Sequence, residues 1–301
     1  MKKALITDKL DKDSKIPLEY GLGIAKNLGL FPTVIHVDQF ADLNAYNHIF
    51  AGLNIEVQKD YFQKILDANN GRLAKQIQSL DADFDELNFE TLAGDPADEI
   101  VEYSKNPDID LIILGNDNQT IVDKVFMGSV SDKVINKVEK SVLLVKGSKF
   151  TKIKKIMVPF DFSDKCEHAL EKALEIAKIN EAKVVLVNVL ECHYDGFYAS
   201  YVIKNGLNEA MTEMIEESKA EMTQKFYDFI KARKLDDAVT FEIALDREGR
   251  ISDTLIQFAA DNACDFIVMG SHKRGKIMRT ILGSVSYNLV KNSSLPVLIA
   301  K

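Results

Sequence analysis

Residues 128–146 read GSVSDKVINKVEKSVLLVK, and residues 283–301 read GSVSYNLVKNSSLPVLIAK. The two segments lie 155 residues apart (283 − 128), and each passes from a GSVS start through a polar and apolar mixture to a closing apolar run. The glycines that precede them, Gly115 and Gly270, keep the same offset of 155 residues (270 − 115). A repeated motif with fixed spacing predicts an internal duplication.

The first part of each half repeats the same plan. Asp8 in KALITD matches Asp161 in KIMVPFD at an offset of 153 residues (161 − 8). Val37, which ends the run IHV, matches Val189, which ends VNV, at an offset of 152 residues (189 − 37). Four landmarks in the same order with nearly constant offset indicate one domain duplicated in tandem. The predicted domains are residues 1–147 and 152–301, joined by the linker Gly147–Lys152.

Length and composition agree with two ordinary globular domains. The chain has 301 residues, and about 100–200 residues per domain is usual. A net charge of -8 argues against a general nucleic-acid-binding protein, which needs a surplus of Lys and Arg. The cysteines Cys166, Cys192 and Cys264 form no CxxC pair, so we expect a reducing, cytoplasmic location without disulfides or a metal site. We expect no signal peptide and no membrane span.

The alternation of short apolar runs with helical periodicity predicts parallel βαβ construction in both halves. The fold class is therefore α/β, with two tandem doubly wound sheets of five strands each. The expected strands are 4–7, 33–37, 87–92, 111–114 and 141–145, and then 155–158, 183–190, 239–245, 266–269 and 296–300. The expected helices of the second half are 168–179, with Ser163 as its N-cap, 207–233, 252–262 and 284–291, and a long helix near 57–80 is expected in the first half.

Two sequence features have a structural interpretation. Met211, Met214, Met222, Phe226 and Ile230 recur at helical spacing, which we interpret as core packing. The Gly21-Leu22-Gly23 run lacks the third glycine of a dinucleotide fingerprint and falls inside the first expected helix, so it indicates close helix packing.

The candidate ligand site lies after the first, second and fourth strands of the second half, because doubly wound sheets bind ligands at the carboxyl ends of their strands. There the sequence reads GSHKRGK at 270–276, followed by GSVS at 283–286 where a helix begins. Glycines and a helix N-terminus can bind an anion, and the basic residues of the loop add positive charge. The alternative is a surface loop that is basic for no functional reason.

These motifs resemble those of the universal stress protein family, whose ATP-binding members carry G-x2-G-x9-G-[ST]. Gly270 and Gly283-Ser284 match that pattern, and Lys273 replaces its middle glycine. Pro159-Phe160-Asp161 resembles the family's P-x-D, and the closing PVLIAK resembles its dimerising strand. The resemblance covers both halves and implies the adenine nucleotide alpha hydrolase-like fold.

The resemblance also implies which residues bind the ligand. Asp161 and the backbone of Val189 would hold the adenine and ribose, the loop from Gly270 to Lys273 would follow the ribose and phosphates, and the helix start at Gly283 would bind the phosphates. The full implied site is Pro159, Phe160, Asp161, Val189, Gly270, His272, Lys273, Gly283, Ser284, Val285 and Ser286. Lys273 either blocks the groove or directs its ammonium at a phosphate, and the sequence leaves both open.

The first half departs further from the family pattern. Asn118 takes the place of the middle glycine, Ile6 stands where the family often has proline, and the loop lacks basic residues. We therefore expect a degenerate, mainly structural site there. Its corresponding residues are Asp8, Val37, Gly115, Asn118, Gly128 and Ser129.

Three functions follow as alternatives. The first is a stress-response or signalling module that binds ATP, ADP or AMP in its C-terminal half, with Mg²⁺ or Mn²⁺ as a possible companion. The second is a slow ATP hydrolase, although no catalytic base or metal cluster is recognisable. The third is a scaffold that binds partner proteins and no nucleotide. By resemblance, strands 142–145 and 297–300 pair antiparallel as an internal pseudo-dimer, a homodimer is possible, and neither nucleic acid nor membrane is an expected partner.

Overall fold

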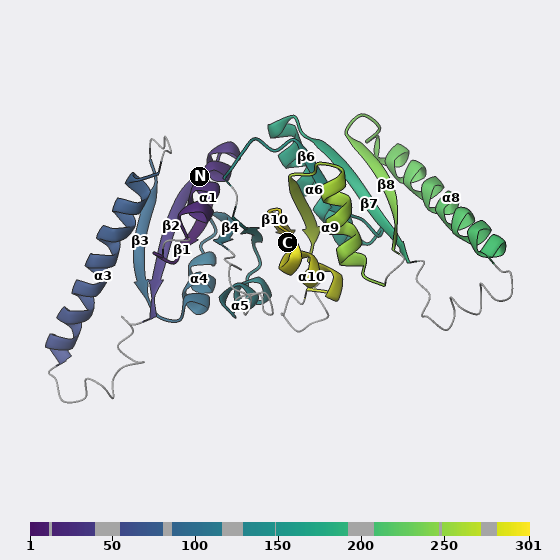
Figure 1. The fold of residues 1–301 in the computed structure, drawn as a ribbon. Coiled ribbons are helices and arrows are strands. Elements are labelled where there is room, and N and C mark those ends of the chain that lie inside the picture. The colour runs from purple at the N-terminus through teal and green to yellow at the C-terminus, as the bar shows by residue number, and fades with distance from the viewer. Residues whose placement is uncertain are drawn as a thin grey trace. The chain divides into compact units, whose positions relative to one another are not determined.

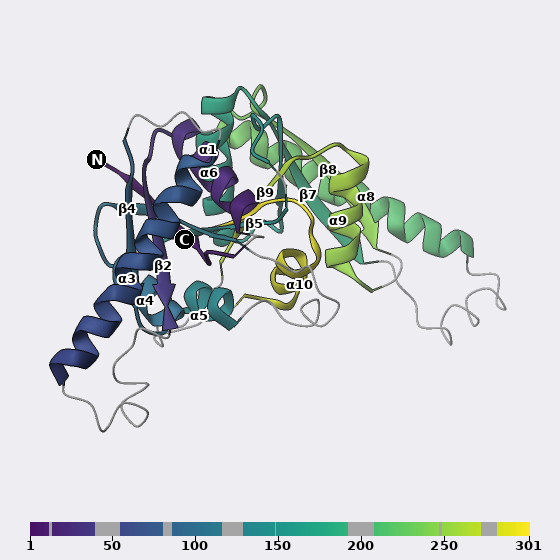
Figure 2. The same ribbon diagram turned by 60° about the vertical axis from the view of Figure 1, so that its left-hand side comes forward.

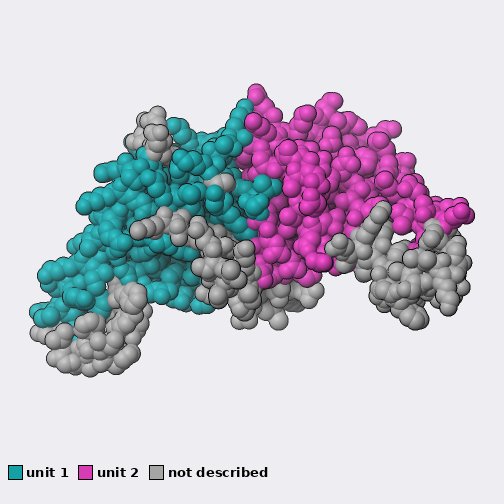
Figure 3. Space-filling model, in the orientation of Figure 1, with its two compact units in different colours: residues 1–152, 271–281, 294–301 teal, residues 153–270, 282–293 magenta. Residues whose placement is uncertain are grey.

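The chain folds into two compact units in a computed structural model (Figure 3). Unit 1 contains residues 1–152, 271–281 and 294–301, and unit 2 contains residues 153–270 and 282–293. The structure describes residues 1–11, 14–39, 55–80, 86–115, 129–147, 149–191, 208–246, 249–271 and 282–301. Within the described residues, no helix combines the length and the apolar composition required to cross a membrane.

Unit 1 is built on a sheet with strand order β3-β2-β1-β4-β5-β10 (Figure 1). The first five strands run parallel, and β10 runs antiparallel to β5. Its elements are β1 (Lys3–Asp8), α1 (Lys15–Asn27), β2 (Phe31–Asp38), α3 (Ile55–Gln78), β3 (Asn88–Ala93), α4 (Pro96–Ser104), β4 (Ile109–Gly115), α5 (Ser129–Lys137), β5 (Ser141–Val145) and β10 (Val297–Ala300).

Unit 2 is built on a parallel sheet with strand order β9-β6-β7-β8. In Figure 1 the long helix α8 runs along β8, and contacts between the two elements confirm this packing. The elements are β6 (Lys155–Pro159), α6 (Asp164–Asn180), β7 (Lys183–Glu191), α8 (Asn208–Arg233), β8 (Val239–Asp246), α9 (Ile251–Asp261), β9 (Phe266–Gly270) and α10 (Ser284–Asn292).

Helices cover both faces of each sheet. In unit 1, α4 contacts α5 (Figure 2), and in unit 2, α9 contacts α10. Strands covered on both faces are apolar along their whole length rather than at alternate positions. All five residues of β5 are buried, as are all four of β10. The predicted α/β class and the predicted strands are confirmed, with ends that differ by only one or two residues.

The C-terminal strand comes from the second sequence repeat but belongs to unit 1, where it lies beside β5. Residues 297, 298 and 299 of β10 pair antiparallel with residues 144, 143 and 142 of β5. After β10, the Lys301 ammonium donates to the backbone carbonyls of Ile135 and Val138 at the end of α5. A cation there interacts favourably with the negative end of the helix. The predicted pairing of the last strands of the two repeats is therefore confirmed.

The glycines of the first helix are explained by packing. A Cβ on Gly21 would lie 2.9 Å from Cγ2 of Ile6, and one on Gly23 would lie 2.7 Å from the Phe150 ring. Both glycines lie in α1. They allow this helix to lie closer to β1 and to Phe150 than a residue with a Cβ would allow. The helix-packing interpretation of this GxG run is confirmed.

The methionine-rich stripe of α8 divides into two parts. Phe226 is fully buried and Ile230 is 6% exposed, so the core interpretation is confirmed for the C-terminal end of the helix. Met214 is 60% exposed, so the same interpretation is wrong for that position. Helical periodicity alone cannot show where the sheet beneath a long helix ends.

Candidate functional site

In unit 2, the order in which the chain adds strands to the sheet reverses at β6. Strands β7 and β8 follow on one side of β6, while β9 pairs with β6 on the other side, with Ile156 opposite Phe266. Pro159 ends β6 and Gly270 ends β9, so these two carboxyl ends are neighbours. A doubly wound sheet has its ligand crevice at such a point. The topology thus brings two of the predicted site segments together.

Asp161 presents one of its two carboxylate oxygens to hydrogen-bond donors of its own unit. Oδ1 accepts the backbone N–H of Ser163 at 3.0 Å and the thiol of Cys166 at 3.1 Å. The side chain is exposed, and within the described residues Oδ2 accepts no hydrogen bond. One oxygen of this carboxylate is therefore fixed by the protein and the other is open to a ligand donor.

The surroundings of Asp161 favour its charged form. Partial burial opposes ionisation, but the hydrogen bonds from Ser163 and Cys166 outweigh that effect and lower the pKa of Asp161. Hydrogen bonds to a charged carboxylate stabilise it relative to the protonated acid. Asp161 therefore remains an acceptor on both oxygens at neutral pH.

The strand ends around Asp161 are held by buried contacts. Phe160 is 2% exposed, and its ring packs on Phe226 at 6.0 Å and Phe229 at 4.9 Å between centroids. The Asn188 side-chain amide donates to the Phe160 carbonyl oxygen at 2.8 Å, and Val189 follows it, half-buried in β7. Aromatic packing and this hydrogen bond join β6 to β7 where the predicted adenine end of the site begins.

Gly270 has a packing role that the sequence did not show. A Cβ at this position would collide with the backbone carbonyl oxygen of Lys165, in the first turn of α6. The matching Gly115 lies under α1, where an added Cβ would be 2.8 Å from Cβ of Pro17. Both glycines allow the first helix of their repeat to approach the sheet closely. Ligand binding is therefore not the only reason for a glycine at either position.

The start of α10 is an open helix N-terminus. Gly283 is the N-cap, in an extended conformation with φ -63° and ψ 162°, and the first turn contains no acidic residue. Ser284 is exposed, whereas Val285 and Ser286 are half-buried. A Cβ on Gly283 would meet no atom of the described residues within 4 Å. The first-turn amides of a helix begin without intrahelical partners, which suits them to an anion.

Several predicted residues lie outside the described part of the chain. His272 and Lys273 of the basic loop do, as do Asn118 and Gly128 of the first repeat. Ser129 begins α5, but its side chain is not described. Whether Lys273 blocks or supports a ligand thus stays an open prediction.

In unit 1, the carboxylate that matches Asp161 is fully used by the protein. Oδ1 of Asp8 accepts the Leu10 N–H at 2.6 Å and the Ser14 hydroxyl at 3.2 Å, and Oδ2 accepts the Gln76 amide at 2.9 Å. Asp8 is 5% exposed, and burial raises its pKa despite these hydrogen bonds. Both oxygens of Asp8 therefore already accept hydrogen bonds within unit 1.

Further polar side chains of α3 close the same edge of unit 1. Arg72 donates to the Leu10 carbonyl oxygen at 3.2 Å and to Oδ1 of Asn69 at 3.2 Å, and Asn69 in turn donates to Asp38. None of these α3 residues was among the predicted site residues. The sequence did contain one indication of this difference. Gln76 lies 153 residues before Phe229, so a polar residue of the first repeat matches an aromatic residue of the second.

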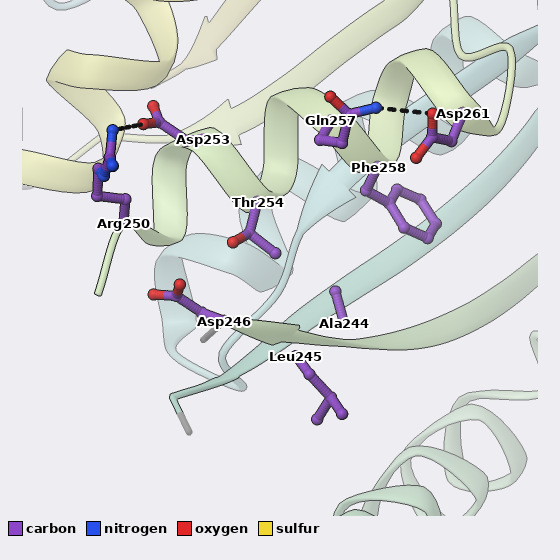
Figure 4. Close-up of a pocket in the computed structure, with 9 residues that line it drawn as sticks. All are labelled: Ala244, Leu245, Asp246, Arg250, Asp253, Thr254, Gln257, Phe258 and Asp261. Carbon is purple, nitrogen blue, oxygen red and sulfur yellow. Dashed lines mark hydrogen bonds and ion pairs between the residues drawn. The ribbon is translucent and has the colours of Figure 1, made fainter. Parts of the chain in front are cut away.

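A separate cleft of about 490 Å³ opens between the end of β8 and α9 (Figure 4). An ion pair joins Arg250 to Asp253 at 3.4 Å, and Gln257 donates to Asp261 at 2.8 Å. The lining residues are Ala244, Leu245, Asp246, Arg250, Asp253, Thr254, Gln257, Phe258 and Asp261. None of them belongs to the predicted site. Elsewhere in the described ranges, no group of three His, Cys, Asp or Glu side chains is placed to hold a metal ion.

Comparison with known proteins gives the same division of the chain into repeats. The profile of the universal stress protein family matches residues 1–146 and again residues 152–301. Universal stress protein MJ0577 of Methanocaldococcus jannaschii is 29% identical over 154 residues, which are 49% of this chain and 94% of that protein. Stress response protein NhaX of Bacillus subtilis is 36% identical over 162 residues, which are 49% of this chain and 97% of that protein.

A solved structure that covers nearly the whole chain has the same fold. A universal stress protein from Archaeoglobus fulgidus is 22% identical, covers 99% of this chain and 96% of its own, and superposes with a TM-score of 0.62. A universal stress protein solved in complex with cAMP is 21% identical and covers 50% of this chain and 98% of its own, with a TM-score of 0.30. With two matches to the family profile and the same fold over its length, the chain belongs to the universal stress protein family as a tandem two-domain member.

Proposed function

We propose that the C-terminal repeat binds an adenine nucleotide, ATP or a close relative, at the carboxyl ends of β6 and β9, and that the N-terminal repeat does not. The observation that carries this proposal is the difference between the two matched aspartates. Asp161 is exposed with Oδ2 open, whereas both oxygens of Asp8 are occupied and the side chain is buried.

The chemistry of a nucleotide suits what unit 2 offers. Asp161 is a charged acceptor for a hydroxyl or amine donor of the ligand, and such charge-assisted hydrogen bonds are the stronger ones. The amides after Gly283 suit the phosphates, and the sequence adds Lys273, Arg274 and Lys276 in the preceding loop. In a protein with a net charge of -8, this local positive charge is what makes an anionic ligand favourable. Phosphates bound there would carry Mg²⁺ or Mn²⁺ into the site.

Calorimetric titration of the full chain with ATP, with and without Mg²⁺, tests the proposal. Wild type is expected to bind about one nucleotide per chain. Asp161→Asn should weaken binding by about tenfold or more, since a hydrogen bond to a charged group contributes ~1.5–3 kcal/mol. Asp8→Asn is the matched control and should bind as wild type does. A wild type that binds no nucleotide, or two equal sites, contradicts the proposal.

The phosphate end is tested by filling the space at the helix start. Gly283→Val places a side chain where a Cβ meets no atom of the described part of the chain within 4 Å, so the fold should tolerate it while the anion is displaced. Gly71→Val, in the exposed middle of α3, is the matched control because its Cβ also meets no atom within 4 Å. Unchanged ATP affinity in Gly283→Val would remove the helix start from the site.

Nucleotide carried through purification gives an independent measurement. Mass spectrometry of the denatured wild type should detect ATP, ADP or AMP, and Asp161→Asn should release much less. We infer a cytoplasmic stress-response or signalling module that changes state with nucleotide. An empty wild type would favour the scaffold alternative, in which the chain acts only through partner proteins.

A further inference from the structure

Three residues at the start of α6 form a short chain of hydrogen bonds that ends on Asp161. The Ser163 hydroxyl donates to Sγ of Cys166 at 3.6 Å, and the Cys166 thiol donates to Oδ1 of Asp161 at 3.1 Å. The Ser163 backbone N–H reaches the same oxygen at 3.0 Å. Ser163 occupies the N-cap position, yet its hydroxyl caps no amide of the helix. The predicted N-cap is therefore confirmed in position, and its hydroxyl interacts with the Cys166 thiol and contributes to the lowered pKa of Asp161 rather than capping the helix.

We propose that Cys166 is a positioning residue for the ligand, because its thiol holds Oδ1 of Asp161 and thereby directs Oδ2 alone toward a donor group of the nucleotide. This inference rests on the proposed nucleotide site. An exposed carboxylate held by a single donor can rotate about its side-chain bonds. A second donor on the same oxygen restricts that rotation before the ligand arrives, which lowers the entropic cost of binding.

The first repeat supports this role with a matching contact. Ser14, which precedes α1, donates its hydroxyl to Oδ1 of Asp8, and the Leu10 N–H donates to the same oxygen. Both repeats thus fix Oδ1 with one backbone N–H and one side chain from the start of their first helix. They differ at Oδ2, which Gln76 occupies in unit 1 and which is open in unit 2 within the described residues.

The thiol is suited to donate rather than to react. Burial, and then the nearby Asp161 carboxylate, raise the pKa of Cys166 to about 11, so the sulfur keeps its proton at neutral pH. A thiolate would be the nucleophilic and oxidisable form. Cys166 is therefore a stable hydrogen-bond donor in this position.

The test is the ATP affinity of two variants of the full chain. Cys166→Ala removes the donor and should weaken ATP binding about 3- to 10-fold, the range expected for one net hydrogen bond. Cys166→Ser keeps a donor of similar size and should stay within about twofold of wild type. Cys264→Ala is the matched control, since Cys264 is buried in unit 2, and its loss should lower stability without changing affinity.

A second readout follows the thiol itself. The rate at which iodoacetamide alkylates Cys166, measured by mass spectrometry across pH, should move to lower pH in Asp161→Asn, because the neighbouring negative charge is gone. An unmoved profile would overturn the contact between thiol and carboxylate.

The outcomes separate this inference from the nucleotide proposal. ATP binding by wild type with equal affinity in Cys166→Ala overturns the positioning role alone. Failure of wild type to bind ATP overturns the nucleotide site, and the positioning role with it.

Discussion

Asp8 ends β1 and Asp161 follows the end of β6 by two residues, and the surroundings of these matched aspartates differ in burial and at Oδ2. Asp8 is buried, its oxygens are occupied, and burial raises its pKa. Asp161 is exposed, and the hydrogen bonds of Ser163 and Cys166 overcome partial burial to lower its pKa. Asp8 therefore accepts hydrogen bonds that stabilise its own unit, whereas Asp161 can accept one from a ligand.

Opposite pH dependences follow from these opposite shifts. A raised pKa in the fold gives stability below the unfolded value of about 3.8, and this stability is lost as the pH rises through the folded pKa. A lowered pKa gives stability above that value, which is lost as the pH falls through the folded pKa. Relative to wild type, Asp8→Asn should therefore gain stability as the pH rises, and Asp161→Asn should lose it.

Urea unfolding at a series of pH values between about 3 and 7 measures both differences. If the two variants show slopes of the same sign, the assigned surroundings of one aspartate are incorrect.

Gly270 makes a second prediction at the scale of one residue. Gly270→Ala forces a Cβ against the Lys165 carbonyl oxygen, and because that oxygen belongs to the backbone of a helix, it cannot move aside easily. We expect a loss of ~1–3 kcal/mol in the free energy of unfolding, the usual effect of overpacking. Gly71→Ala is the control, since it lies in a helix with no atom within 4 Å of its Cβ. It should gain about 0.5–1 kcal/mol from helix propensity. A neutral Gly270→Ala would contradict the close approach of α6.

At the scale of elements, the second long helix of each repeat decides how open the strand ends are. In unit 1, α3 directs Gln76 and Arg72 onto the loop that follows β1. In unit 2, α8 directs aromatic rings onto the segment that follows β6 instead, with the Phe226 and Phe162 ring centroids 4.7 Å apart. An aromatic ring cannot donate to a carboxylate as an amide does, so α8 stabilises the edge without occupying Asp161.

The two ends of α8 should respond differently to truncation. Phe226→Ala removes a fully buried ring and should cost ~3–5 kcal/mol of stability. Met214→Ala alters an exposed side chain on the same helix and should change stability by less than about 0.5 kcal/mol. Thermal or urea unfolding of the two variants measures the contrast. A large effect of Met214→Ala would show that this end of the helix is covered.

The polar closure of unit 1 can be tested through α3. Gln76→Leu keeps the approximate size of the side chain but leaves Oδ2 of Asp8 buried without its donor. Leaving a buried polar group unpaired costs ~1–3 kcal/mol, and more for a charged one. Gln63→Leu, on an exposed part of α3 where the glutamine donates to Asp67 at 2.9 Å, should be nearly neutral. Equal unfolding midpoints for both variants would show that the Gln76 contact does not stabilise unit 1.

At the scale of the whole molecule, β10 carries the end of the second repeat into the sheet of unit 1. A fragment of residues 1–147 lacks β10, so the hydrogen-bonding edge of β5 would be exposed. Exposed, apolar strand edges pair with other chains. We expect this fragment to form a dimer in light scattering, and Leu143→Lys in the fragment to weaken it. A stable monomeric fragment would contradict the importance of the β5–β10 pairing.

Much of this architecture was predictable from the chain alone. The constant offset between the two GSVS motifs determined the duplication. Continuous apolar strands, separated by segments of helical periodicity, determined the α/β class, because strands covered on both faces must be apolar throughout. The antiparallel pairing of strands 142–145 and 297–300 followed from the family resemblance, whereas the register that places Val142 opposite Ile299 came from the structure. The exposure of Met214 did not follow, because helical periodicity continues beyond the sheet that the helix covers.

The sequence by itself determined two repeats, their strands, the Gly-Ser start of the last helix and the aspartate after each first strand. Only the tertiary structure decided which aspartate is available, because that depends on Gln76 and Cys166, residues 68 positions after Asp8 and five after Asp161. It also decided that Gly270 lies against Lys165. Contacts between distant segments arise from packing, and a linear pattern contains the participants of such contacts but not their pairing.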